Sequence, residues 1–589
     1  MLLLLLGSFL IMILMFFTYK FNHSLVMISG ITIIYSLFAF YQLGSFKMPS
    51  TYYSPENANE EVVINNSSAN LSFDQIYLFS GEGENTDASN YEIYYRNSEI
   101  LGSEDGENYQ LLAKLDQKEF AKYTIINLDQ EYSYPYLKIV FKNTNAIINE
   151  FALLDSKSNE FKELKLAANQ NEDYQNMIDE QDQITIDPTY YSETFFDEIY
   201  HVRNALEIAN GQFMYAHVHP LLGTSLIALG IKIFGFNPFG FRVMGTLFSI
   251  LMLPLIFNFS QKIFKKVSVA SFSTILFAAD FMHYTTGRIA TLEPFSIFFI
   301  ILMYYLMYNY LQIDFKVKNT RKIMLNLAAI GFTMSLAWAT KWTGIYASIG
   351  IVILYFYQII INFKKENYQL IIKVILSSFI FFVFLPAFIY ILVYSWCHFT
   401  VEWPNSFLEL SKNVLNQIIY MFDYHANLES THPFQSTWYM WLLDIRPIWY
   451  YVKHVNDSVS SISCFNNPLI SWMGLFSLFY LIYDYFKSKN KLAIFILLAY
   501  LSQLLPWVFV TRCVFAYHYY PSIPFLILAI TYFFNSLIQK NPKYLKSAVI
   551  YLFLVVFLFI MFFPAISGIM VSQNYIKSFL VWFKSWNLV

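Results

Sequence analysis

Long apolar runs separated by short polar segments make up most of the chain outside residues 50–190. Apolar runs of about 17–25 residues are long enough to cross the hydrocarbon core of a bilayer as helices. The pattern predicts twelve spanning helices, over residues 2–17, 25–44, 241–260, 267–283, 290–311, 323–340, 342–362, 369–396, 467–486, 492–510, 516–537 and 546–571. Residues 221–235 are apolar but shorter, which favours a helix lying at the membrane surface. The expected fold class is an α-helical polytopic membrane protein.

Basic residues in the short loops predict the orientation of these helices, because cytoplasmic loops are enriched in Lys and Arg. One alternating set of loops carries most of them: Lys262, Lys265, Lys266, Lys316, Lys318, Arg321, Lys322, Lys364, Lys365, Lys487, Lys489, Lys491, Lys540, Lys543 and Lys546. The other set carries only Arg288, Lys341 and Arg512. We therefore expect a multi-pass protein of the cell membrane, with residues 45–240 and 397–466 on the extracytoplasmic side.

Residues 50 to about 190 change character, and short alternating runs separated by turn residues appear there. The runs are LSFDQIYLFS, NYEIYYRN, YQLLAKL, KYTIINL, YLKIVFKN and AIINEFALL. Such alternation predicts an antiparallel β-sandwich of about 110 residues. The order of its runs resembles a discoidin-like, galactose-binding jelly roll. The acidic stretch 171–183 is interpreted as a polar linker or a surface helix.

These patterns divide the chain into five parts. They are two N-terminal helices (1–49), the sandwich (50–170), a membrane core with an acidic first external segment (171–396), an external loop (397–466) and C-terminal helices (467–589).

The composition supports a membrane protein, since only 13% of the residues are charged where soluble proteins carry about 25%. The net charge of −3 gives no support for a nucleic-acid partner. Of the three cysteines, Cys397 and Cys464 flank one predicted loop and could form a disulfide, although free thiols are favoured. No metal-ligand cluster stands out, and the requirement for a divalent metal is left open.

Two adjacent carboxylates, Asp197 and Glu198, begin a short amphipathic segment beside long apolar runs. Adjacent side chains on a helix point about 100° apart, so the two carboxylates are expected to have different roles. One can face a reacting centre while the other orients a partner. The alternative is a solvated helix start, where acidic residues are favoured in any case.

Five further ionisable residues lie at predicted external helix ends. His219 precedes Pro220 and either caps a helix or serves the site. Arg242 either has a buried partner or extends to the interface. In GRIATLEP, Arg288 and Glu293 are functional or form an ion pair with each other. Lys341 is placed to meet a phosphate, or anchors the interface beside Trp342.

The external loop contains the string THPFQSTWYMWLLDIRPIWYY, residues 431–451, in which His432 and Arg446 are the ionisable candidates for binding. Aromatic residues alone are common at membrane interfaces and carry little information here. Arg512, with His518 and Tyr519 close by in sequence, forms one more external cluster.

Over residues 195–571 these motifs, in this order, resemble the protein O-mannosyltransferases, glycosyltransferase family 39 of the GT-C superfamily. The matching elements are Phe-acid-acid at 196–198, His219-Pro220, Arg242, the Arg288 segment, Lys341 with Gly344, and the 431–451 string. The sequence departs from the family pattern at His217, Leu221, Thr224 and Glu293. The short loop 397–466, without the β-trefoil insert of eukaryotic members, resembles the bacterial branch.

The resemblance implies transfer of a sugar, most often mannose, from a polyprenyl-phosphate lipid to Ser or Thr hydroxyls of an exported protein, with inversion. Asp197 would accept the hydroxyl proton, and Glu198 and His219 would orient the acid or the acceptor. Substrate contacts are implied for Arg242, Arg288, Glu293, Lys341, His432, Arg446 and Arg512. No metal ligand is assigned.

Two other functions remain open. The same architecture could glycosylate a lipid or a cell-wall polymer, and a closer match of 431–451 to one branch would discriminate. A transporter or sugar-binding membrane protein predicts ionisable residues at the bilayer midplane. The ionisable residues here cluster instead at external helix ends.

Overall fold

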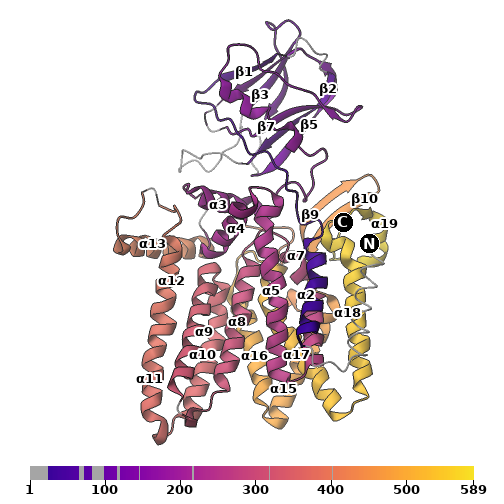
Figure 1. Ribbon diagram of the computed structural model, residues 1–589. Coiled ribbons are helices and arrows are strands. Elements are labelled where there is room, and N and C mark those ends of the chain that lie inside the picture. The colour runs from indigo at the N-terminus through magenta and orange to yellow at the C-terminus, as the bar shows by residue number, and fades with distance from the viewer. Residues whose placement is uncertain are drawn as a thin grey trace.

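The computed structural model describes residues 24–65, 72–81, 98–115, 120–142, 144, 146–214, 218–317, 319–400 and 402–589. Within these ranges, nine helical segments are long and apolar enough to cross a membrane. They are α5 (Pro238–Phe264), α8 (Glu293–Leu311), α9 (Thr320–Thr340), α10 (Thr343–Asn362), the Lys365–Tyr394 segment with α11 (Tyr368–Phe379) and α12 (Leu385–Tyr394), α15 (Pro468–Ser488), the Lys491–Phe509 segment with α16 (Lys491–Leu504), the Ala516–Lys540 segment with α17 (Ile523–Lys540), and α18 (Tyr544–Ser567). These helices run side by side in one bundle (Figure 1).

Two of the predicted spans are shorter than the apolar pattern indicated. The helix α2 (Ser24–Phe40) has 17 residues and packs beside α5, and α6 (Val267–Ala278) has 12. The predicted 267–283 helix is interrupted because Asp280 accepts hydrogen bonds from the backbone of His283 and Asn467, which starts the separate helix α7 (Phe281–Thr286). The predicted span 2–17 lies outside the described residues. Eleven of the twelve predictions therefore correspond to apolar helices, in a multi-pass membrane protein.

Pro386 explains a wide turn inside the longest span. Residues Ile380–Phe384 form a π turn between α11 and α12. Proline has no N–H to donate and its ring clashes with the carbonyl four residues earlier. A π turn relieves that clash while the helix continues.

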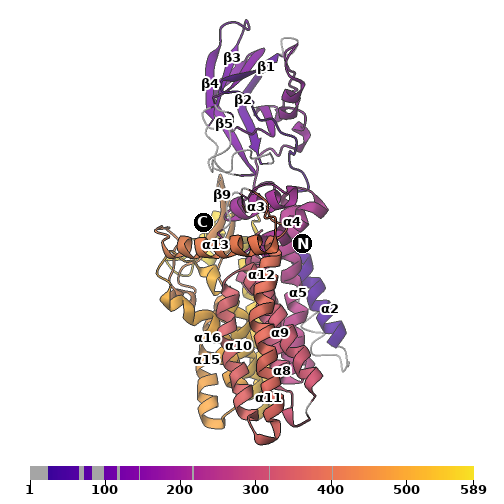
Figure 2. The same ribbon diagram turned by 90° about the vertical axis from the view of Figure 1, so that its left-hand side faces the viewer.

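Helices that do not run along the bundle cross it at one end, between the membrane helices and the sandwich (Figures 1 and 2). They are α3 (Glu198–Asn210), α4 (Leu222–Phe234) and α13 (Phe407–Ala426). The predicted surface helix at 221–235 corresponds to α4. The helix α13 falls in the stretch predicted only as an external loop, which also contains α14 (Trp438–Trp441) and the hairpin of β9 (Ile448–Val455) and β10 (Ser458–Cys464). The short strand β11 (Val571–Ser572) pairs with β10.

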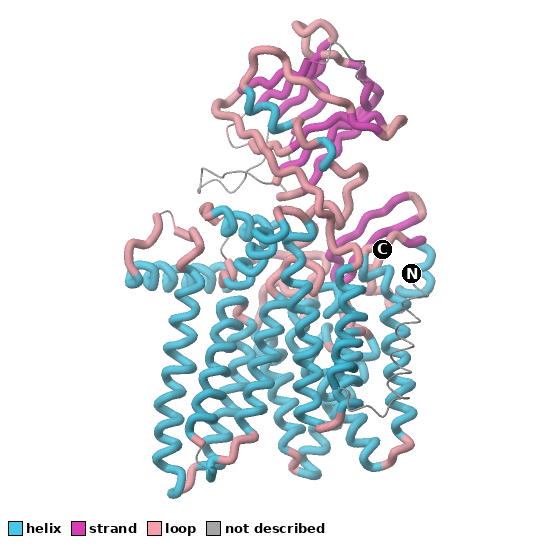
Figure 3. Tube along the Cα trace, in the orientation of Figure 1, coloured by secondary structure: helices cyan, strands magenta, loops and turns pink. Residues whose placement is uncertain are grey.

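In its described residues, the inserted domain is a β-sandwich of two four-stranded antiparallel sheets, drawn above the bundle in Figure 3. One sheet has the order β1-β6-β3-β4, with β1 (Glu60–Asn65), β6 (Tyr136–Phe141), β3 (Ser98–Ser103) and β4 (Gln110–Leu115). The other has the order β5-β2-β7-β8, with β5 (Lys122–Ser133), β2 (Ser72–Ser80), β7 (Glu150–Asp155) and β8 (Glu160–Phe161). Alternating residues such as Ile76 and Leu78 face the other sheet, whereas Tyr77 packs on the outer side. The galactose-binding likeness stays a prediction.

Five of the six predicted runs contain strands, and NYEIYYRN lies outside the described residues. The strands β1, β3 and β8 of the sandwich were not predicted from the sequence. The acidic stretch 171–183 forms two short 3₁₀ turns, Glu172–Met177 and Gln181–Gln183.

Candidate active site

A cavity of about 850 Å³ lies at the end of the bundle that faces the sandwich. Its walls come from α3, the loop before α4, the start of α8, the turn between α9 and α10, α13, and the chain from Trp507 to His518. The ionisable side chains that line it are Asp197, Tyr200, His201, His219, Glu293, Lys341, Tyr346, Tyr420, Tyr424, His425, Arg512, Tyr517 and His518. Segments far apart in the sequence thus contribute to one polar chamber above apolar helices.

Asp197 stands at the entrance to α3 and faces this cavity. Its side chain makes no capping hydrogen bond to the helix. The carboxylate therefore does not have the role of a helix N-cap. Asp197, His201 and Asn204 follow at helical spacing and all line the cavity. The pKa of Asp197 is raised to about 7. The larger cause is loss of water around the carboxyl group, and the smaller is the nearby negative charge of Glu293. A carboxyl group with that pKa can exchange a proton near neutral pH.

Glu293 and Lys341 form an ion pair in the wall opposite α3. Glu293 begins α8, while Lys341 lies in the turn between α9 and α10. The Lys341 ammonium also lies 5.8 Å from the centre of the Tyr517 ring. Arg288, the sequence neighbour considered as a partner for Glu293, does not form this pair.

Three histidines line up along the cavity wall. The ring centres of His201 and His219 are 5.9 Å apart, and those of His219 and His425 are 5.2 Å apart. Burial lowers the pKa of His201 and of His425 to about 4, and lowers that of His219 well below its usual value. These rings are therefore neutral at pH 7, and His425 donates Nε2–H to the carbonyl of Val218 at 2.9 Å.

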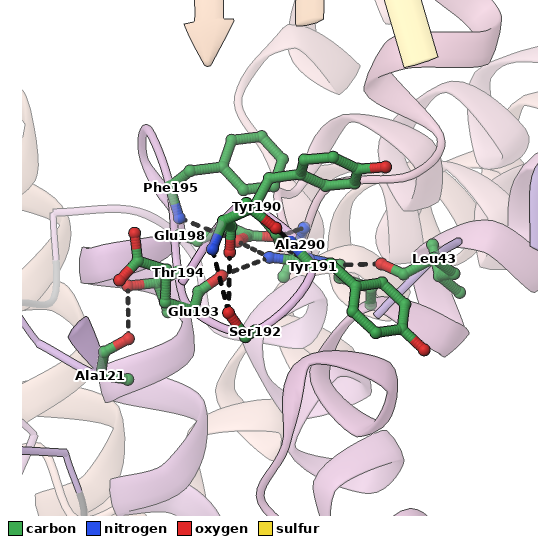
Figure 4. Close-up of polar contacts among 12 residues, drawn as sticks. Leu43, Ala121, Tyr190, Tyr191, Ser192, Glu193, Thr194, Phe195, Glu198 and Ala290 are labelled. Carbon is green, nitrogen blue, oxygen red and sulfur yellow. Dashed lines mark hydrogen bonds and ion pairs between the residues drawn. The ribbon is translucent and has the colours of Figure 1, made fainter. Parts of the chain in front are cut away.

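Glu198 lies outside the cavity, although it is adjacent to Asp197. Its carboxylate forms a fully buried pair with Arg242, with Nε–Oε1 and Nη2–Oε2 distances of 2.7 Å. It also accepts the backbone N–H groups of Phe195 and Ala290, which Figure 4 shows around it. Glu198 therefore holds the start of α3 to the membrane core.

Arg242 has no N–H group left for a substrate phosphate in this arrangement. Two of its five donors meet Glu198, and the other three meet the carbonyls of Leu43, Tyr190 and Glu193 at 2.6–3.0 Å. Of the two outcomes expected for Arg242, a buried partner is the one observed, and that partner is Glu198. The substrate contact that the resemblance implied for Arg242 is corrected accordingly, because its side chain does not line the cavity.

Three other predicted binding residues also lie away from the cavity. Arg288 donates to the carbonyls of Ala39, Tyr41 and Gln42 and so caps the end of α2. Arg446 is exposed and reaches the carbonyl of Gln435. His432 is exposed and packs on the Phe515 ring at 5.1 Å. The fold thus brings together Asp197, His219, Glu293, Lys341 and Arg512, and leaves Arg288, His432 and Arg446 outside.

His201, His425 and Tyr517 line the cavity but were not predicted from the sequence as site residues. His201 could have been found from its spacing of four residues after Asp197. His425 ends a helix that was expected to be a loop, so no local signal connected it with the site. The cysteines Cys397, Cys464 and Cys513 are free thiols. Among the described residues, no group of three or more His, Cys, Asp and Glu side chains is arranged to hold a metal ion.

Comparisons with known proteins identify the family of the chain. Residues 234–401 match the family model "Dolichyl-phosphate-mannose-protein mannosyltransferase", and residues 410–586 match "C-terminal four TMM region of protein-O-mannosyltransferase". The chain is 23% identical over 465 residues to "Polyprenol-phosphate-mannose--protein mannosyltransferase" of Mycobacterium tuberculosis, covering 66% of this chain and 86% of the relative. It is 24% identical over 436 residues to the protein of the same name from Corynebacterium glutamicum, covering 63% of this chain and 81% of the relative.

Among solved structures, the S. cerevisiae protein O-mannosyltransferase Pmt1-Pmt2 complex bound to the sugar donor matches with a TM-score of 0.57 at 15% identity. The match covers 67% of this chain and 90% of that chain. The bundle with its polar chamber is therefore the fold of a GT-C-type membrane glycosyltransferase. The chain belongs to the protein O-mannosyltransferase family, glycosyltransferase family 39.

Proposed function

We propose that this protein transfers mannose from a polyprenyl-phosphate donor to Ser or Thr hydroxyl groups of exported proteins, with inversion at the anomeric carbon. The names of the mycobacterial and corynebacterial relatives support the donor, the sugar and the protein acceptor. The observation that carries the proposal is the position of Asp197, in a polar cavity and with a pKa near 7.

The reaction needs a base, because an alcohol is a weak nucleophile. As the acceptor oxygen bonds to the anomeric carbon, Asp197 takes the hydroxyl proton and the carbon–phosphate oxygen bond breaks. The lipid leaves as polyprenyl phosphate, carrying the electron pair of that bond.

The leaving phosphate needs positive charge nearby, and the cavity provides it in Lys341 and Arg512. Preorganised cations in a chamber with little water stabilise developing negative charge strongly. Glu293 holds Lys341 in place and so prevents the ammonium from pairing with Asp197. Lys341 is kept from the residues that the resemblance implied, whereas Arg242 and Arg446 lie away from the cavity and Arg512 takes their place.

The test is Asp197→Asn in the purified full-length protein, assayed with radiolabelled polyprenyl-phosphate mannose and a synthetic Thr-rich peptide. Loss of general-base catalysis is worth about 10²–10⁴-fold, so transfer should fall by about that factor. The matched control is Asp457→Asn, at an exposed position in the β9–β10 turn. Transfer by Asp197→Asn at the rate of the control would contradict the proposal.

A further inference from the structure

The segment Tyr190–Glu198 joins the sandwich to the membrane core and runs into the first residue of α3. It follows the sandwich in the chain, contacts both the sandwich and the membrane core, and delivers Asp197 to the cavity. Neither this segment nor the sandwich falls within the two stretches matched by the family models, which begin at residue 234. Its contacts are drawn in Figure 4.

On the sandwich side, the contacts involve Glu193 and Thr194. The buried Thr194 hydroxyl donates to the carbonyl oxygens of Phe120 and Ala121, at 2.6 and 3.2 Å, and the Thr194 N–H donates to Ala121 at 3.1 Å. The Glu193 carboxylate accepts the backbone N–H of Tyr123, at the start of β5, at 3.2 Å. The turn before β5 is therefore attached to the segment at Thr194, three residues before Asp197.

On the core side, the same segment is held by Arg242. The guanidinium donates to the carbonyls of Tyr190 and Glu193 and pairs with Glu198, one residue beyond Asp197. The segment is therefore hydrogen-bonded to the sandwich through Thr194 and to the membrane core through Arg242.

Between these two attachments, Phe196 has a φ of +53°, a conformation that bulky residues rarely adopt. Such a residue keeps this conformation only when its surroundings hold it. The Phe196 ring stacks on Tyr450 at 4.6 Å, which is one of those restraints. The backbone turn that aims Asp197 into the cavity thus depends on contacts on both sides of the segment.

We propose that the inserted β-sandwich positions Asp197 for the transfer, and that Thr194 is the positioning residue through which it does so. The inference rests on the proposed function, since it concerns the placement of the base in that reaction. The sandwich then forms part of the support for the catalytic geometry, in addition to any ligand of its own. Thr194 does not touch the substrate and acts through the backbone of residues 194–197.

The experiment compares Thr194→Val, Thr194→Ser and Thr144→Val in the full-length protein. Valine keeps the shape of threonine but removes the hydroxyl donor, whereas serine keeps the donor. Thr144 is exposed on the same domain and serves as the matched control. Steady-state transfer from polyprenyl-phosphate mannose to the Thr-rich peptide gives kcat and the KM for the donor, and hydrogen exchange of the peptide spanning 190–200 reports on the segment itself.

A displacement of about 1 Å at a reacting group can cost up to about 10²-fold in rate, so kcat of Thr194→Val should fall by about ten- to a hundredfold. We expect its KM for the donor to stay within about twofold, because Lys341 and Arg512 are unchanged. Amide exchange in 190–200 should become faster. Thr194→Ser should restore both kcat and exchange, and Thr144→Val should match the wild type.

Several results would overturn the inference. Wild-type kcat in Thr194→Val, or slow exchange of 190–200 in that variant, would show that the hydroxyl does not position the base. If kcat falls as much in Thr194→Ser as in Thr194→Val, the hydroxyl is likewise not what positions the base. If Thr194→Val does not fold, Thr194→Cys, which has only a weak donor, takes its place with the same expected outcomes. Failure of the wild type itself to use the donor would instead overturn the proposed function, and this inference with it.

Discussion

At the scale of single residues, the pair Asp197 and Glu198 divides two tasks between adjacent carboxylates. Their side chains point about 100° apart on α3, so one faces the cavity and the other the protein interior. Glu198 is fully buried against Arg242, and Asp197 remains accessible to a substrate in the cavity. The carboxylate that forms the strong ion pair is thus the one that supports the fold, and the unpaired one is suited to proton transfer.

This division predicts a stability effect for Glu198→Gln. Gln would leave the buried Arg242 charge without a counterion and direct an amide N–H₂ toward other N–H donors. Breaking a buried ion pair typically costs about 3–5 kcal/mol, so the unfolding transition in detergent should shift down by several degrees. Asp197→Asn should unfold no earlier than the wild type, since Asn does not require burial of a charge. Equal melting temperatures for Glu198→Gln and Asp197→Asn would show that the ion pair does not support the fold.

The raised pKa of Asp197 predicts the pH dependence of transfer. The carboxyl group must be ionised to accept a proton, and with a pKa of about 7 it becomes protonated as the pH falls below neutral. At saturating donor, the rate should therefore fall about tenfold per pH unit below pH 7 and level off above it. For an Asp with an ordinary pKa, this fall in rate on the acid side of the profile (the acid limb) would begin near pH 4. The measurement is kcat between pH 5 and 9.

A variant at Glu293 tests the second cause of the raised pKa of Asp197, since loss of water around the carboxyl group is the first. Glu293, Lys341 and Tyr517 are the groups that act on the Asp197 carboxyl, and the Glu293 charge raises its pKa. Glu293→Gln removes that negative charge and frees the Lys341 charge, and both changes favour ionised Asp197. The acid limb should move to lower pH in this variant. If kcat of this variant begins to fall at the same pH as in the wild type, the titrating group is one other than Asp197.

At the scale of elements, α13 lines the cavity but was not predicted as a helix from the sequence. Its residues Leu410, Val414, Gln417 and Met421 are buried, and the polar residues Glu409, Lys412, Asn416 and Asp423 follow on another face. A third face exposes Leu408, Leu415, Ile419 and Phe422. Three faces of different character in 20 residues give no simple apolar run, so hydropathy alone indicates a loop.

The apolar face of α13 predicts that the helix lies in the membrane interface. It crosses the ends of the spanning helices, and an amphipathic helix in that position buries its apolar face among lipid chains (Figure 2). Spin labels at Leu415 and Ile419 in nanodiscs should be accessible to oxygen. Labels at Lys412 and Asn416 should be accessible to a water-soluble nickel reagent instead. The reverse pattern would place α13 in water.

At the scale of the whole molecule, the hydropathy pattern was sufficient for the spanning helices and for most strands of the sandwich. Pairing between distant residues could not be predicted in the same way. Arg242 pairs with Glu198, 44 residues away, and Glu293 pairs with Lys341 and not with its neighbour Arg288. Local sequence specifies where a charge lies along a helix, but its partner depends on how helices pack. This is why Arg242 and Arg288 were expected at the substrate and are found in structural contacts.

The distribution of basic residues makes a prediction for the orientation of the whole molecule. The sandwich and the cavity lie at one end of the bundle (Figure 1), and the Lys-rich turns such as the one after α8 should face the cytoplasm. Ser158 is exposed on the sandwich, and Lys316 is exposed in the turn between α8 and α9. Cys397 and Cys464 are buried, whereas Cys513 is partly exposed, so all three are replaced by Ser before labelling.

In intact cells, a membrane-impermeant maleimide should label Ser158→Cys and should label Lys316→Cys only after the membrane is opened. This result would place the candidate active site on the extracytoplasmic side, where exported proteins present their hydroxyl groups. Labelling of Lys316→Cys alone in intact cells would place the cavity in the cytoplasm. Such an orientation is incompatible with exported acceptors that are modified after crossing the membrane, and the acceptor class would then have to be sought among cytoplasmic molecules.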